Sequence, residues 1–145
     1  MKEAIEVLNA LEKEGLFSRY AIGGAMAATF YVEPVLTYDL DIFVIFPESA
    51  GLAPLSPLYE KLRGMGFSEE GECIRVHGVP VQFLPAYNVL LEYALREAIE
   101  TEYDGTPTRV LSIEYLIAIC LQTVDPKTAI VYVFLGKKPI STTRS

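Results

Sequence analysis

Hydrophobic residues recur at helical intervals at the start of the chain. Within residues 2–14, Ile5, Leu8 and Leu11 fall on one side of a helix and charged residues fall on the other. This pattern predicts an amphipathic helix. Gly15 follows it directly, and glycine commonly ends helices because it adopts the left-handed conformation easily.

Two strands separated by a short helix are predicted next. The apolar segment 20–22 predicts a strand, and the small apolar residues of 25–31 predict a buried helix that ends before Pro34. Residues 40–46 predict another strand, which is apolar at every position after Asp41. Because no polar residue interrupts this run, we expect a central strand that is covered on both faces.

The second half of the chain alternates helical and strand-like patterns. By the same criteria we expect helices over 56–63, 88–100 and 112–121, and strands over 72–77, 79–84 and 106–111. Pro80 places its strand near a sheet edge or at its own start, because proline donates no backbone hydrogen bond. Residues 125–134 leave two structures open: Asp125-Pro126 suits a helix start, whereas 130–134 have the composition of a strand.

Composition and charge describe an ordinary globular domain. The 145 residues are 51% hydrophobic and 21% charged, and they suffice for one domain with a sizeable core. The 12 Lys and Arg face 19 Asp and Glu, which gives a net charge of −7. Because nucleic-acid backbones are usually held by a basic face, a long nucleic-acid footprint is disfavoured unless a partner supplies cations. A small phosphate substrate bound together with a metal ion remains compatible with this charge.

The cysteines, the histidine and the hydropathy profile suggest no chemistry of their own. Cys73 and Cys120 are too few for a disulfide framework, and we expect buried thiols in a reducing compartment. His77, the single histidine, is expected in a surface turn. No segment approaches the ~18–20 apolar residues of a membrane helix, and no signal peptide is recognisable. We therefore expect a cytoplasmic protein with no membrane partner.

A pair of acids supplies the first candidate for chemistry. Asp39 and Asp41 stand two positions apart where the predicted strand 40–46 begins. Side chains two apart on a strand share a face, so the carboxylates would lie about 6–7 Å apart along the chain. Such close like charges repel unless a cation lies between them, and magnesium prefers oxygen ligands. The alternative is a solvent-exposed pair at a strand start.

Gly23-Gly24 supplies the second candidate. Glycine lets backbone amides approach a phosphate closely, and this pair precedes a predicted helix. A plain strand-to-helix turn that needs a positive φ is the alternative reading. With Asp39 and Asp41 at a neighbouring strand end, the pair predicts a metal-dependent phosphoryl or nucleotidyl transfer site.

The chain resembles the nucleotidyltransferase superfamily in these two motifs, which read Ala-Ile-Gly-Gly-Ala at 21–25 and Thr-Tyr-Asp-Leu-Asp at 37–41. That superfamily includes DNA polymerase beta-like enzymes, minimal nucleotidyltransferases and AbiEii-type toxin nucleotidyltransferases. The resemblance spans roughly residues 18–121, and 111–117 resembles the helix after the core in the AbiEii-like branch. It implies an α/β (α+β) domain over 1–122, with a mixed sheet and helices packed mainly on one side. A C-terminal extension, 123–145, would follow and end in a frayed tail.

The resemblance also implies roles for individual residues. Gly23 and Gly24 would border the triphosphate of a bound nucleotide. Asp39 and Asp41 would be the catalytic residues and would hold magnesium ions. Thr37 matches a position that often bears Ser or Thr before the acids, and it is a further candidate for nucleotide binding.

One position departs from the superfamily pattern. A third carboxylate usually stands on a neighbouring strand, and the matching residue here is Gln82. An amide oxygen can ligate a cation weakly or position a hydroxyl, but it cannot act as a general base. Glu72 is the nearest carboxylate in sequence, although no geometric reason recruits it. Arg75 is a candidate for neutralising a triphosphate.

Two functions follow from the resemblance. The first is magnesium-dependent transfer of a nucleoside monophosphate from a triphosphate such as ATP to an RNA or protein acceptor, in a toxin–antitoxin or defence system. The second, which Gln82 favours, is a catalytically impaired domain that binds a nucleotide or a partner. With either function, we expect a homo-oligomer or a partner protein, because the acidic chain lacks the cations that a nucleic-acid acceptor needs.

Overall fold

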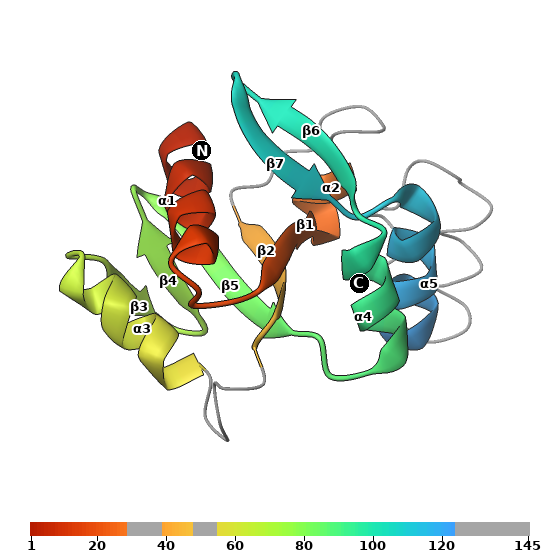
Figure 1. Ribbon diagram of the computed structural model, residues 1–145, viewed down its shortest axis with the longest axis horizontal. Coiled ribbons are helices and arrows are strands. Elements are labelled where there is room, and N and C mark those ends of the chain that lie inside the picture. Colours follow the sequence, from red (N-terminus) through yellow and green to blue (C-terminus); the bar gives the residue numbers. More distant parts are fainter. Residues whose placement is uncertain (29–38, 48–54, 124–145) are drawn as a thin grey trace.

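The computed structural model describes residues 1–28, 39–47 and 55–123 (Figure 1). The helices are α1 (Lys2–Lys13), α2 (Gly24–Ala28), α3 (Leu55–Gly64), α4 (Val89–Arg96) and α5 (Ile113–Thr123). The strands are β1 (Arg19–Gly23), β2 (Leu40–Ile45), β3 (Ser68–Glu70), β4 (Cys73–Val76), β5 (Val79–Pro85), β6 (Ile99–Tyr103) and β7 (Thr106–Val110).

The strands form one mixed sheet in the order β3-β4-β5-β2-β1-β7-β6. β2 lies in the middle, antiparallel to β1 and parallel to β5. β7 runs parallel to β1, and the remaining pairs are antiparallel. The predicted mixed sheet and the central position of β2 are therefore confirmed.

Residues along the central strands alternate between two hydrophobic cores. Tyr20, Ile22 and Ile42 belong to a larger core with α1 and α3. Ala21 belongs to a smaller core with α4, and Phe43 and side chains of α5 pack against it. Because consecutive residues of a strand face opposite sides, the helices cover both faces of the sheet.

The expectation that helices pack mainly on one side is thus wrong. The apolar run from Ile42 to Phe46 places hydrophobic side chains on both faces of β2. Each face must be covered to keep these side chains away from water. In Figure 1, α1 and α3 lie beside β4 and β5, whereas α4 and α5 lie together away from them, with α4 against the central strands β1 and β2.

Two tight turns set the registers of the outer hairpins. His77-Gly78 joins β4 to β5 with φ of 49° and 82°, and Asp104-Gly105 joins β6 to β7 with φ of 50° and 81°. Positive φ at both turn residues is the signature of the type I′ hairpin turn. His77 is exposed in its turn, as predicted, and its ring lies edge-on to Phe67 at 5.0 Å.

The helix predicted over 88–100 is too long. α4 ends at Arg96, and Ile99 begins β6, where it is 43% exposed instead of lying on the inner side of a helix. The Asp104-Gly105 turn explains the difference, because it folds residues 99–103 back onto β7 and satisfies their backbone groups in a ladder. The Asp-Gly pair was the available sequence signal.

The other elements agree with expectation within a few residues, apart from β3. Its three residues are polar and exposed, so hydrophobic periodicity gave no sign of this strand. Pro80 stands at the start of β5, just before Val81 begins the pairing with β2. Part of the helix predicted over 25–31 is seen as α2, and its remainder lies outside the described residues, as do 124–145.

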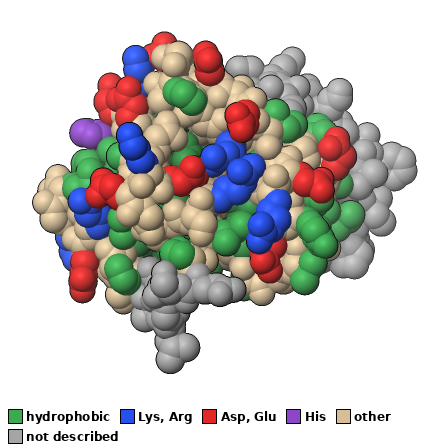
Figure 2. Space-filling model, in the orientation of Figure 1, with side chains coloured by type: hydrophobic (Ala, Val, Ile, Leu, Met, Phe, Trp, Pro, Cys, Tyr) green, Lys and Arg blue, Asp and Glu red, His purple; other side chains and the backbone are tan. Residues whose placement is uncertain are grey.

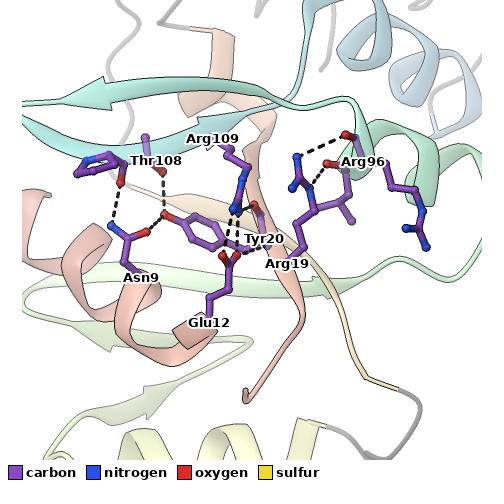
Figure 3. Close-up of polar contacts among 9 residues, drawn as sticks. Asn9, Glu12, Arg19, Tyr20, Arg96, Thr108 and Arg109 are labelled. Carbon is purple, nitrogen blue, oxygen red and sulfur yellow. Dashed lines mark hydrogen bonds and ion pairs between the residues drawn. The ribbon is translucent and has the colours of Figure 1, made fainter. Parts of the chain in front are cut away.

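A polar network ties α1 to the sheet (Figure 3). The Tyr20 hydroxyl donates to Asn9 Oδ1 at 2.7 Å and lies 2.9 Å from Thr108 Oγ1. The Glu12 carboxylate accepts from Arg109 Nη1 and Nη2 at 2.8 and 3.0 Å, and from the Tyr20 backbone amide at 3.0 Å. α1 is therefore fixed to β1 and β7 by directional contacts as well as by its apolar face.

Replacing Tyr20 by Phe tests this network. The substitution removes the hydroxyl of a residue that is only 1% exposed. We therefore expect the free energy of unfolding at pH 7 to fall by about 1–2 kcal/mol. Burial raises the pKa of Tyr20 to about 12. The unfolded tyrosine loses its proton near pH 10 and the folded one only near 12, so wild-type stability falls across this window.

The Tyr20→Phe variant lacks this titration, and the stability difference between the two proteins should therefore shrink as the pH rises from about 10 to about 12. Urea unfolding at several pH values measures it. A difference that stays constant over this window would contradict the buried environment of the hydroxyl.

Candidate functional site

Three of the predicted site residues lie in one row across the sheet. Asp41, near the start of β2, is the Cα partner of Gly23 at the end of β1 and of Gln82 on β5. Side chains in register on neighbouring strands share a face, so Gln82 stands beside the Asp41 carboxylate. The structure thus brings together the glycine motif, one acid and Gln82, the residue that the resemblance matches to a third acid.

The two acids differ in their surroundings. Asp39 lies immediately before β2 and is exposed, whereas Asp41 is half-buried in the strand. Burial raises the pKa of Asp41 above its ordinary value, and the negative charge of Asp39 raises it further. Removing an anion from water and placing a second anion nearby both disfavour its charged form. A bound cation would relieve both costs.

Each glycine of the motif makes room for a particular side chain of β2. A Cβ on Gly23 would overlap the ring of Phe43, with Cδ2 at 2.6 Å. A Cβ on Gly24 would overlap Oδ2 of Asp41, with Cγ at 3.0 Å. Gly24 also has a φ of +62°, which glycine adopts readily. The pair is therefore a turn that needs glycine and, at the same time, a close neighbour of Asp41.

Cys73 belongs to this neighbourhood, and sequence reasoning missed it. The β4–β5 ladder pairs Ile74 with Val81, and one further residue brings Cys73 level with Gln82. Burial raises the pKa of the Cys73 thiol, and the charges of Asp39 and Asp41 raise it further. Counting residues back from the His77-Gly78 turn would have revealed this placement. Cys73 and Cys120 are both half-buried, and neither forms a disulfide.

Arg75 has partners within its own hairpin. Its Nε and Nη2 donate to the Glu70 carboxylate at 2.8 and 3.0 Å, and its Nη1 donates to the Gly78 carbonyl at 2.8 Å. These contacts hold the guanidinium at the β3–β4 end of the sheet. Its predicted contact with a triphosphate would have to compete with them. Thr37 lies outside the described residues.

The donor set suits a hard cation. Carboxylate and amide oxygens, as in Asp39, Asp41 and Gln82, are the ligands that magnesium prefers. Among residues 1–28, 39–47 and 55–123, no group of three His, Cys, Asp or Glu side chains is arranged to hold a metal ion. The described acids therefore offer two carboxylates, and the Gln82 amide lies beside the second of them.

The visible surface carries no continuous basic face. Figure 2 shows Lys and Arg side chains in small groups interspersed with Asp and Glu. Several are paired, as in the Lys61–Glu14 and Arg63–Glu69 contacts. Within the part of the chain that the structure describes, no helix is long and apolar enough to cross a membrane.

The fold is similar to that of known structures. No family model matches the sequence, and the search of curated proteins finds no match. A nucleotidyltransferase-like protein from Paracoccidioides brasiliensis superposes with a TM-score of 0.55 at 17% identity, over 99% of this chain and 81% of that one. The solution structure of the antibiotic-resistance factor ANT(2'')-Ia superposes with a TM-score of 0.51 at 17% identity, over 91% and 80%. The chain therefore has a nucleotidyltransferase-like fold.

Proposed function

We propose that this chain is a magnesium-dependent nucleotidyltransferase. It would move a nucleoside monophosphate from a nucleoside triphosphate, such as ATP, to a hydroxyl of an RNA or protein acceptor. The observation that carries the proposal is the register of Gly23, Asp41 and Gln82, with Asp39 directly before the strand. The nucleotidyltransferase-like fold supports it, because the motifs that suggested the chemistry come together in one place on that fold.

The residues of this row and their neighbours Asp39 and Gly24 would have distinct tasks. Asp39 and Asp41 would hold magnesium, which neutralises phosphate charge and stabilises the leaving pyrophosphate. Gly23 and Gly24 would leave space for the triphosphate next to the turn. The Gln82 amide would orient the acceptor hydroxyl or the cation, since it cannot take up a proton. In the transfer the acceptor oxygen bonds to the α-phosphorus, the bond to the pyrophosphate oxygen breaks, and the hydroxyl proton passes to solvent.

A partner is part of this proposal. With a net charge of −7, the chain has few cations to spare for an RNA backbone. A second protein or a second copy of the chain would supply the basic surface, or the partner would itself carry the acceptor hydroxyl. The toxin–antitoxin setting implied by the resemblance is one such arrangement.

Replacing Asp41 by Asn tests the enzymatic role. The substitution keeps the shape of the side chain and removes its charge, so magnesium affinity and nucleotide transfer should fall at least about a hundredfold. Mutation of a residue that only hydrogen-bonds to a metal ligand typically lowers metal affinity or activity about 10–100-fold, and mutation of a ligand itself should lower them no less. Glu102→Gln is the matched control, because Glu102 is an exposed acid on the edge strand β6.

Transfer is measured with radiolabelled nucleoside triphosphates and candidate tRNA and protein acceptors. The wild type and Glu102→Gln should label an acceptor, and the Asp39→Ala/Asp41→Ala double variant should not. Transfer that survives the double variant would exclude these acids as the catalytic pair.

The second candidate function is binding without catalysis: the domain would bind a nucleotide or a partner protein and transfer no group. Two observations favour it: the residue paired with Asp41 on β5 is Gln82, an amide and not a carboxylate, and no three-residue metal-ligand group occurs among the described residues. In this case the fold would have kept the nucleotide site and lost the chemistry.

Replacing Gln82 by Asp separates the two functions. A third carboxylate adds negative charge and a general base to the site, and the variant should bind magnesium more tightly than the wild type. Calorimetry with magnesium-ATP measures the binding, and the transfer assay measures turnover. The binding function would be established if the wild type binds ATP in a metal-dependent way without turnover and Gln82→Asp shows turnover. Turnover by the wild type would exclude it.

A further inference from the structure

We infer that Gly24 is a positioning residue for the Asp41 carboxylate. The absence of a side chain at Gly24 lets this carboxylate lie against the turn between β1 and α2, where the cation is expected. The inference rests on the proposed function for its consequence, the binding of a cation. The steric contact itself is independent of that function.

The contact distinguishes Gly24 from the other described glycines that have positive φ. Six glycines of the described residues have a positive φ. At five of them a Cβ would meet nothing within 4 Å. These five are Gly15, Gly66, Gly71, Gly78 and Gly105. At Gly24 the same atom would overlap Asp41 Oδ2 and lie 3.0 Å from Cγ and 3.2 Å from Cβ.

Backbone conformation alone therefore does not account for the effect expected of a substitution at Gly24. A β-carbon there would collide with the side chain of Asp41. Asp41 belongs to the central strand β2 and is held in register with both Gly23 and Gln82. The strand cannot shift without disturbing two ladders, so the carboxylate would have to rotate away. A methyl group at residue 24 would thus move the proposed cation ligand while leaving its chemistry unchanged.

A comparison of Gly24→Ala with Gly105→Ala separates this contact from backbone strain. Gly105 has a φ of +81° and open space around its Cβ position, so its substitution adds strain without a collision. Mn²⁺ serves as the probe, and electron paramagnetic resonance measures its binding. Gly24→Ala should lose at least about tenfold in Mn²⁺ affinity, as expected when a ligand is mispositioned, and Gly105→Ala should bind like the wild type.

A stability cycle tests the collision without any metal. The fall in urea midpoint caused by Gly24→Ala should be much smaller in an Asp41→Ala background, which removes the carboxylate. It should be unchanged in an Asp41→Asn background, which keeps its shape. If Gly24→Ala fails to fold, recovery of folding in the Gly24→Ala/Asp41→Ala protein supports the inference. Failure of both proteins to fold overturns it.

The possible failures are distinguishable. Equal destabilisation by Gly24→Ala in all three backgrounds would overturn the steric contact. Equal Mn²⁺ affinity of folded Gly24→Ala and Gly105→Ala would overturn the positioning role and leave the proposed function standing. A wild type that does not bind Mn²⁺ would contradict the proposed function, and the stability cycle alone would then decide whether Gly24 positions Asp41.

Discussion

The antiparallel pairing of β1 with β2 is the constraint on which the rest of the structure depends. The ladder runs from Arg19↔Ile45 to Gly23↔Asp41. Because side chains alternate between faces, this register decides which residues enter each core. It directs Tyr20 and Ile22 toward α1, and Ala21 toward α4 and α5. A slip of one residue would exchange the two faces and would also separate Gly23 from Asp41.

The same pairing links packing to chemistry at the end of β1. Gly23 has no side chain, so the Phe43 ring can occupy the space above it and close the smaller core. Asp41, two residues before Phe43 on the same face of β2, lies against Gly24. The first glycine of the pair thus makes room for a hydrophobic ring, and the second makes room for a carboxylate. Either contact alone would make glycine hard to replace there.

Electrostatics distinguishes the polar network near α1 from the candidate site. Near α1, Glu12 is matched by Arg109 in a two-point ion pair, and this contact raises the pKa of Arg109. At the site, burial and Asp39 raise the pKa of Asp41, so its charged form is destabilised. A paired charge stabilises the fold, whereas a half-buried carboxylate beside a second acid costs stability until a cation binds. This contrast supports a functional reading of Asp39 and Asp41.

The sequence alone determined most elements and the site motifs, because each rests on a local property. Helical spacing in residues 2–14, the apolar run after Asp41 and the position of Pro80 each predicted an observed feature. Asp39, Asp41 and the glycine pair were recognisable as candidates from their types and spacing, and the structure places Gly23 and Gly24 next to Asp41. The end of the helix predicted over 88–100 was misjudged because its apolar spacing continued past Arg96, where hairpin pairing competes with helix.

Tertiary structure alone decided how these local pieces combine. Which helices cover each face of the sheet depends on where distant helices return, and the apolar run of one strand does not specify this. The placement of Cys73 level with Gln82 follows from a hairpin register, and the fit of Asp41 against Gly24 follows from a strand pairing across an intervening segment. Such contacts are fixed by long-range register and packing, because these determine which side chains occupy the same space.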